Sequence, residues 1–107
     1  MRVCVPITVD GQVDPRWGRA DRVAVADVIQ GEIRGWQEFT VGWEALHDQG
    51  TEGAHHARVA RFLRENQVQA IAVHHIGLGM QRMLASMSIR AVTGLGGDAR
   101  SAARAAE

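Results

Sequence analysis

The chain has 107 residues, with 12 basic and 12 acidic side chains, so its formal net charge is zero. No basic surplus is available to neutralise phosphates, which argues against a nucleic-acid partner, and no apolar run of about 18 residues predicts a membrane span. Every basic residue is an arginine, which excludes lysine Schiff-base chemistry and the P-loop lysine, and we expect a single cytoplasmic domain over residues 1–107.

Hydrophobic periodicity and turn residues predict an α/β chain with the element order βββαβαβα. Runs rich in β-branched residues predict strands at 2–9, 22–29, 33–41, 69–75 and 88–93. Helical spacing predicts helices at 52–66 and 79–87, and a third helix, rich in alanine and arginine, after residue 98. The segments 10–21 and 42–51 carry turn-forming residues and are expected to be loops.

Local signals indicate how these elements are joined. Gln30-Gly31 suits a tight turn, which would join the second and third strands as an antiparallel hairpin. Thr51 or Asp48 is expected to cap the first helix, and Asp98 the last. The later strands follow helices and should be parallel with right-handed crossovers, so we expect a mixed five-stranded sheet with helices on its faces.

All five histidines fall where the strands end and the helices begin, which is the rim where open α/β sheets bind ligands. Neutral imidazole is a common metal ligand, so the histidines are candidate ligands. One member of each adjacent pair should face the site, with Asp48 as a further ligand or as an acceptor for an imidazole N–H. Structural or solvated histidine is the alternative. The candidates are His47, His55, His56, His74 and His75.

Glycine turns at the same rim precede two helices. Gly77 and Gly79 open the second helix, and Gly96 and Gly97 precede the third. Free N–H groups at a helix N-terminus favour anions, and residues 16 and 19 add positive charge. We therefore consider Arg16, Arg19 and the four glycines as candidate cofactor-binding residues. The alternative is that the glycines only permit tight turns and that the arginines are solvated.

The remaining residues with potentially reactive side chains are better explained by packing than by catalysis. Cys4 lies within an apolar strand and is expected to be buried and inert. Met83 and Met87 recur at helical spacing and are expected in the core, whereas Met80 should lie at the rim. Ser86 and Ser88 are expected at the opposite end of the sheet from every histidine, so nucleophilic catalysis fits poorly.

Several segments together resemble the dinitrogenase iron–molybdenum cofactor biosynthesis domain family, over roughly residues 2–105. The segments are Val5-Pro6, Val13-Asp14-Pro15-Arg16-Trp17-Gly18-Arg19-Ala20, Phe62-Leu63, Ile76-Gly77-Leu78-Gly79-Met80 and Gly94-Leu95-Gly96-Gly97-Asp98. The family usually has phenylalanine in place of Trp17. The resemblance implies a ribonuclease H-like three-layer fold and, with the hairpin and crossovers, the strand order 3-2-1-4-5 with the second strand antiparallel.

The resemblance also implies binding of iron–sulfur or molybdenum–iron–sulfur clusters or their precursors. The chain departs from the family by having no cysteine at the rim and by its histidine pairs. We therefore expect non-enzymatic binding or carriage of a cluster or divalent metal at the rim, with a cofactor-assembly protein as partner and a homodimer left open. The alternatives are a mononuclear histidine-ligated metal enzyme, with Asp48 or Glu52 as base, and a small-anion-binding regulatory module.

Overall fold

The computed structural model describes residues 1–107 and contains one mixed sheet with the strand order β3-β2-β1-β4-β5. The strands are β1 (Arg2–Ile7), β2 (Arg22–Ile29), β3 (Glu32–Thr40), β4 (Ala70–Ala72) and β5 (Arg90–Val92). β2 is antiparallel to β1 and β3, whereas β4 is parallel to β1 and β5. The predicted strand order and the antiparallel second strand are confirmed.

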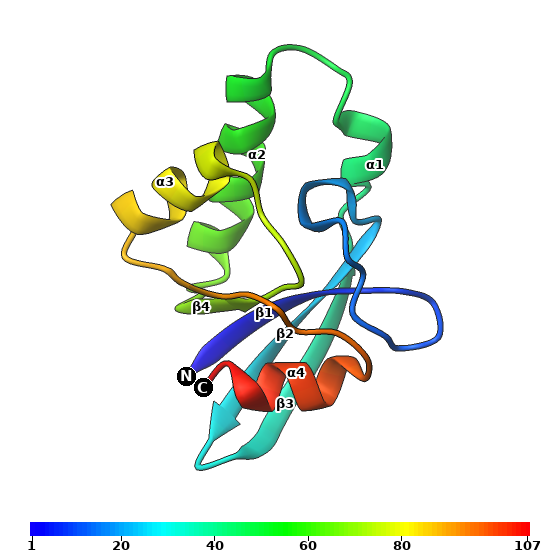
Figure 1. Cartoon of the computed structure of the whole chain (residues 1–107), viewed down its shortest axis with the longest axis vertical. Coiled ribbons are helices and arrows are strands. Elements are labelled where there is room, and N and C mark those ends of the chain that lie inside the picture. The colour runs from blue at the N-terminus through cyan, green and yellow to red at the C-terminus, as the bar shows by residue number, and fades with distance from the viewer.

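Helices cover both faces of the sheet. α2 (Glu52–Glu65) and α3 (Leu78–Ser86) lie on one face, and α4 (Ala99–Ala105) lies on the other (Figure 1). Two hydrophobic clusters match this division: one contains the large side chains under α2 and α3, and the other joins the alanines of α4 to small strand residues. No helix is both long and apolar enough to cross a membrane.

Proline within β1 is tolerated because of where its backbone points. Pro6 pairs in register with Val23 of β2, yet its carbonyl accepts the N–H of Asp14 over 2.9 Å. The N–H and C=O of one strand residue point the same way, so the missing proline donor faces away from β2. The β1–β4 pairing covers only Val3 and Cys4, so no ladder bond is lost there.

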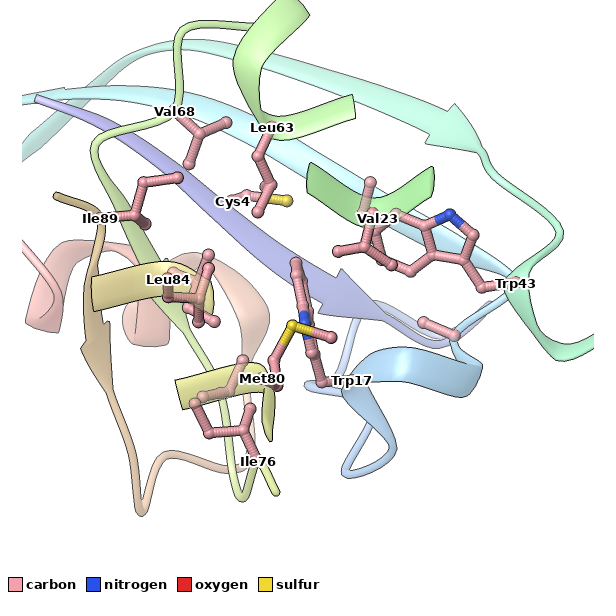
Figure 2. Close-up of a cluster of buried hydrophobic side chains, with 14 of the residues drawn as sticks. Cys4, Trp17, Val23, Trp43, Leu63, Val68, Ile76, Met80, Leu84 and Ile89 are labelled. Atoms are coloured by element: carbon pink, nitrogen blue, oxygen red, sulfur yellow. The ribbon is translucent and has the colours of Figure 1, made fainter. Parts of the chain in front are cut away.

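The two expected loops contain short helices that the sequence pattern did not predict. A 3-10 turn, η1 (Trp17–Arg19), lies in the first loop, and α1 (Trp43–Leu46) lies in the second. Both begin with a buried tryptophan, and the two indole rings meet edge to face at 5.1 Å. Figure 2 shows Trp17 and Trp43 among the side chains of the larger cluster. These tertiary contacts, rather than local propensity, order both segments.

The remaining local expectations are largely confirmed. Thr51 Oγ1 accepts the Ala54 N–H over 3.0 Å, and Asp98 caps α4. Gln30 and Gly31 both have positive φ, as the hairpin turn requires. The fourth strand is shorter than expected: it spans Ala70–Ala72, although the Val73 N–H still donates to the Val92 carbonyl over 3.0 Å.

Cys4 lies where the sequence predicts it, fully buried within the larger cluster. Burial raises the pKa of its thiol well above the ordinary value of 9.0, because the thiolate would lose its hydration. The thiol is therefore protonated and out of contact with solvent. Met80 and Leu84 of α3 pack into the same cluster (Figure 2), and Met83 and Met87 are partly buried against it.

Candidate functional site

A hollow of about 410 Å³ opens at the end of the sheet where α2 and α3 begin. Its walls are residues 15–19, His47, the first turn of α2 and residues 75–80. We call it the rim hollow. Its position confirms that the loop around η1, the start of α2 and the β4–α3 turn meet at one place.

His55 is buried in the wall of the rim hollow, with 3% of its surface exposed. Its Nε2 lies 2.8 Å from the carbonyl oxygen of Gly18, and its Nδ1 lies 2.8 Å from Arg58 Nη1. Burial is the main cause that lowers the pKa of His55 below 6.5, and the Gly18 carbonyl opposes it. Both ring nitrogens are thus occupied by protein partners.

His47 lies against His55 but reaches a different partner. The two rings meet edge to face with centroids 5.0 Å apart. His47 Nδ1 lies 3.1 Å from Asp48 Oδ1, and this contact, more than nearby Arg19, lowers the pKa of the Asp48 carboxyl. Asp48 therefore stands as an acceptor for an imidazole N–H, one of the two roles considered for it.

His56 lies next to His55 in the first turn of α2. It lines the rim hollow, and its side chain is half-buried. Its Nε2 is 3.8 Å from Glu52 Oε1, a weak contact at i,i+4 spacing. A methyl group placed on Gly79 would lie only 3.1 Å from His56 Cε1. The absence of a side chain at position 79 is what lets α3 begin against this imidazole.

The second histidine pair separates, although it lies beyond the end of β4 and both side chains are exposed. His75 lines the rim hollow and His74 does not. The backbone carbonyl of His74 accepts the N–H of Gly94 over 2.9 Å. The structure therefore brings His47, His55, His56 and His75 to one cavity and leaves His74 outside it, so the expectation of one histidine from each pair holds only for the second pair.

Arg16 and Arg19 line the rim hollow but are held by carboxylates. Asp14 accepts from the Arg16 backbone N–H at 2.9 Å and from Arg16 Nε at 3.3 Å, and this bond raises the pKa of the guanidinium. Glu44 lies 3.4 Å from Arg16 and 3.7 Å from Arg19, and Asp48 lies 3.9 Å from Arg19. The carboxylates of Asp14, Glu44 and Asp48 therefore surround the two guanidinium groups, and we call these three residues the acidic collar.

The two glycine turns end in different places. Gly77 and Gly79 line the rim hollow at the start of α3, whose N-cap, Gly77, offers no side chain to its first-turn N–H groups. Gly96 and Gly97 do not line it. The Gly97 carbonyl instead accepts the N–H of Val13 over 2.8 Å on the way into α4.

Sequence reasoning missed three residues of the site: Asp14, Glu44 and Arg58. The i,i+3 spacing of His55 and Arg58 on one helix was a usable signal. A weaker signal was the position of Asp14 two residues before Arg16; its burial is known only from the structure. Nothing in the sequence pointed to Glu44, because the helix that carries it was not predicted.

The possible ligands are spread around the cavity instead of converging on a point. No group of three or more His, Cys, Asp or Glu side chains is placed to hold one metal ion. Met80 adds a buried thioether side chain to the wall. The walls thus offer imidazole nitrogen, thioether sulfur, backbone N–H groups and paired guanidinium groups.

Comparison with known proteins gives a family and a fold. The family model described as dinitrogenase iron-molybdenum cofactor matches residues 1–107. The crystal structure of PH0822 superposes with a TM-score of 0.75 at 19% identity, covering 98% of this chain and 87% of that one. The apo orange protein of Desulfovibrio gigas superposes with a TM-score of 0.74 at 21% identity, covering 94% and 80%. No curated protein matches the chain.

Proposed function

Because the chain belongs to the dinitrogenase iron–molybdenum cofactor family, we propose that it binds and carries a metal–sulfur cluster, or a precursor of one, in the rim hollow. The observation that carries this proposal is the meeting of His47, His56 and His75 with the uncapped start of α3 at one cavity. These groups come from separate segments of the chain.

The cavity suits a cargo of small-molecule size. Its volume of about 410 Å³ lies within the range of ordinary ligand pockets. Neutral imidazoles can bind iron or another transition metal, and the N–H groups at the start of α3 can donate to sulfide or oxide atoms. The donor chemistry of the walls therefore fits a metal-containing anion.

The spacing of the donors favours a cluster over a bare ion. A single divalent ion needs three or four protein ligands that converge at about 2 Å from it. The histidines here are distributed around the walls. A cluster brings its own bridging sulfides and needs only a few outer ligands from the protein, so distributed imidazoles suit it.

The acidic collar does not prevent an anionic cargo from using the arginines. The Arg16–Glu44 and Arg19–Glu44 pairs are exposed and longer than 3.3 Å. Exposed ion pairs of this kind are weak, because water screens both charges. A multiply charged cargo can therefore draw the guanidinium groups away from Glu44. A carrier of this type would deliver its cargo to a cofactor-assembly protein.

Anaerobic reconstitution tests the proposal. The untagged protein is incubated with ferrous iron and sulfide, with and without molybdate, then desalted and assayed for metal, sulfide and visible charge-transfer absorption. We expect metal and sulfide to be retained together. His75→Gln, and more strongly the double variant His56→Gln/His75→Gln, should lower the retained amount.

His74→Gln is the matched control, because it removes the neighbouring imidazole that does not line the rim hollow. It should retain as much metal as the wild type. Equal losses in the two single variants, or no retained metal in the wild type, would count against cluster carriage. Retention of molybdate alone would favour the anion-binding module, and one metal ion without sulfide would favour the mononuclear site.

A further inference from the structure

We propose that His55 is a positioning residue, which fastens the η1 segment and the end of α1 to α2 and thereby shapes the rim hollow. It is the most buried of the five histidines and the one whose two ring nitrogens both have protein partners at 2.8 Å. The consequence for cargo rests on the proposed function, whereas the fastening role does not.

The two hydrogen-bond partners determine which nitrogen of the His55 ring carries the hydrogen. Arg58 can only donate, so the His55 Nδ1 that faces Arg58 Nη1 must be the acceptor. The Gly18 carbonyl can only accept, so the Nε2 that faces it must carry the hydrogen. The ring is therefore neutral, in the Nε2–H form, with a defined donor on one side and a defined acceptor on the other.

The partners of this ring belong to the segments that carry the candidate site residues. Gly18 lies between Arg16 and Arg19. Arg58 Nη1 also donates to the Leu46 carbonyl at 3.3 Å, directly before His47. Trp17 and Trp43 already anchor these two segments to the core, and one imidazole and one guanidinium also tie them to the first two turns of α2.

His47 packs on the same ring, which extends the effect to a candidate ligand. Its ring meets the His55 ring edge to face at a centroid distance of 5.0 Å. Removing the His55 ring would take away this platform together with both hydrogen bonds. A loss of cargo in such a variant would therefore arise through Arg16, Arg19 and His47, without any bond from His55 to the cargo.

A glutamine substitution separates positioning from ligation. The amide of His55→Gln offers one acceptor and one donor, as the Nε2–H imidazole does, but it is a poor ligand for iron. A leucine at the same position fills similar space and offers neither. A positioning role predicts that glutamine preserves function and leucine does not, whereas a ligand role predicts that both fail.

The experiment compares wild type, His55→Gln and His55→Leu, with His56→Gln as the control at a wall position. Imidazole nitrogen NMR at neutral pH reports the wild-type tautomer, and amide NMR reports residues 16–19 and 47. Iron and sulfide retention after reconstitution, with the absorption maxima of the bound cluster, reports the cargo. We expect a protonated Nε2 before and after loading. His55→Gln should keep the wild-type maxima and most of the cargo.

His55→Leu should shift the amides of residues 16–19 and 47 and weaken retention by about tenfold or more, as loss of an orienting group does. Equal loss in the two His55 variants, or loss of the Nε2 hydrogen on loading, would overturn the proposal. If His55→Leu does not fold, His55→Gln and the wild-type tautomer decide. If the wild type retains no cargo, the proposed function fails. The fastening role is tested separately: amide shifts in His55→Leu that are confined to residue 55 would overturn it.

Discussion

Gly79 shows how much one missing side chain matters at the residue scale. Its backbone is not in the left-handed region, so alanine fits the local conformation, but the new methyl would lie 3.1 Å from His56 Cε1. Alanine is favoured over glycine within a helix by up to about 1 kcal/mol. We therefore predict that Gly79→Ala keeps or raises the stability of the fold while displacing the His56 ring and lowering cargo retention.

Thermal unfolding reports the stability of Gly79→Ala, and metal retention reports its cargo binding. Both are measured on the same sample. Gly77→Ala is the control, because a methyl there meets nothing within 4 Å. It should leave the His56 ring unchanged, so it separates the effect of the methyl on His56 from the effect of an added alanine at the wall. An unchanged His56 NMR signal in Gly79→Ala would contradict the close packing on which the prediction rests.

Cys4 provides the opposite case, a reactive residue type without a role at the site. Its side chain is buried against the α2 and α3 face of the sheet. Cys4→Ala should cost roughly 1–2 kcal/mol in the free energy of unfolding, as a small core truncation does, and leave cargo retention unchanged. Denaturant unfolding measures the first effect. Rapid reaction of the native wild-type thiol with a labelling reagent would show that the burial is wrong.

At the scale of elements, the start of α2 links local capping to the site. Thr51 Oγ1 accepts the Ala54 N–H at 3.0 Å, and the next two residues are His55 and His56. Thr51→Ala should destabilise the fold by about 1 kcal/mol, as loss of a threonine cap typically does. Because fraying would begin in the turn that carries both imidazoles, cargo retention should fall with it.

Urea unfolding and reconstitution check this prediction, with Thr51→Ser as the control that keeps the hydroxyl. Serine should restore both stability and retention. Loss of stability with full retention would mean that the first turn of α2 is held in place by the His55 contacts alone.

The elements that sequence predicted are those fixed by local pattern. The sheet order follows from the Gln30-Gly31 turn, the crossovers and the family resemblance, and all are properties of nearby residues or matched motifs. η1 and α1 escaped prediction because their order comes from Trp17 and Trp43 meeting across 26 positions of sequence. Local propensity carries no trace of such a contact.

The candidate site, like the fold, was predictable only where local sequence pattern determines it. Sequence placed four of the five histidines, all but His74, in segments that line the rim hollow, because strand ends and helix starts locate them without side-chain detail. It could not tell which member of each pair faces the cavity. Adjacent helical residues differ by about 100° in direction, and only the packing of Gly18 and Arg58 around one ring shows that His55 turns inward. The carboxylate pairing of Arg16 and Arg19 likewise depends on the unpredicted α1.

At the scale of the whole molecule, the two faces of the sheet are built for different tasks. The α4 side is closed by small residues, including Ala99, Ala102 and Ala103, so the helix lies close to the strands. The α2 and α3 side is built from larger side chains, and two of them, Trp17 and Met80 (Figure 2), also line the rim hollow. The termini meet at the other end, where Arg90 contacts both Met1 and Ala106.

Two buried groups predict how the stability of the molecule depends on pH. The pKa of His55 is lowered from 6.5, chiefly by burial, so the unfolded chain binds a proton there more readily than the folded chain. Stability should therefore fall as pH falls through 6.5 toward the folded value. The pKa of Cys4 is raised from 9.0, so only the unfolded thiol ionises just above that pH, and stability should fall as pH rises past it.

Denaturant unfolding across this range should give a maximum between about pH 6.5 and 9.0 if these two groups dominate. His55→Gln should flatten the acid side of the profile and leave the alkaline side, since an amide does not titrate. Cys4→Ala should do the reverse. The carboxyl of Asp98, whose pKa is lowered from 3.8 mainly by the Ser101 N–H, acts only at lower pH and does not disturb the comparison. An acid limb of the same slope in wild type and His55→Gln would show that His55 is not neutral in the fold, and would remove the hydrogen-bond assignment that fastens η1 to α2.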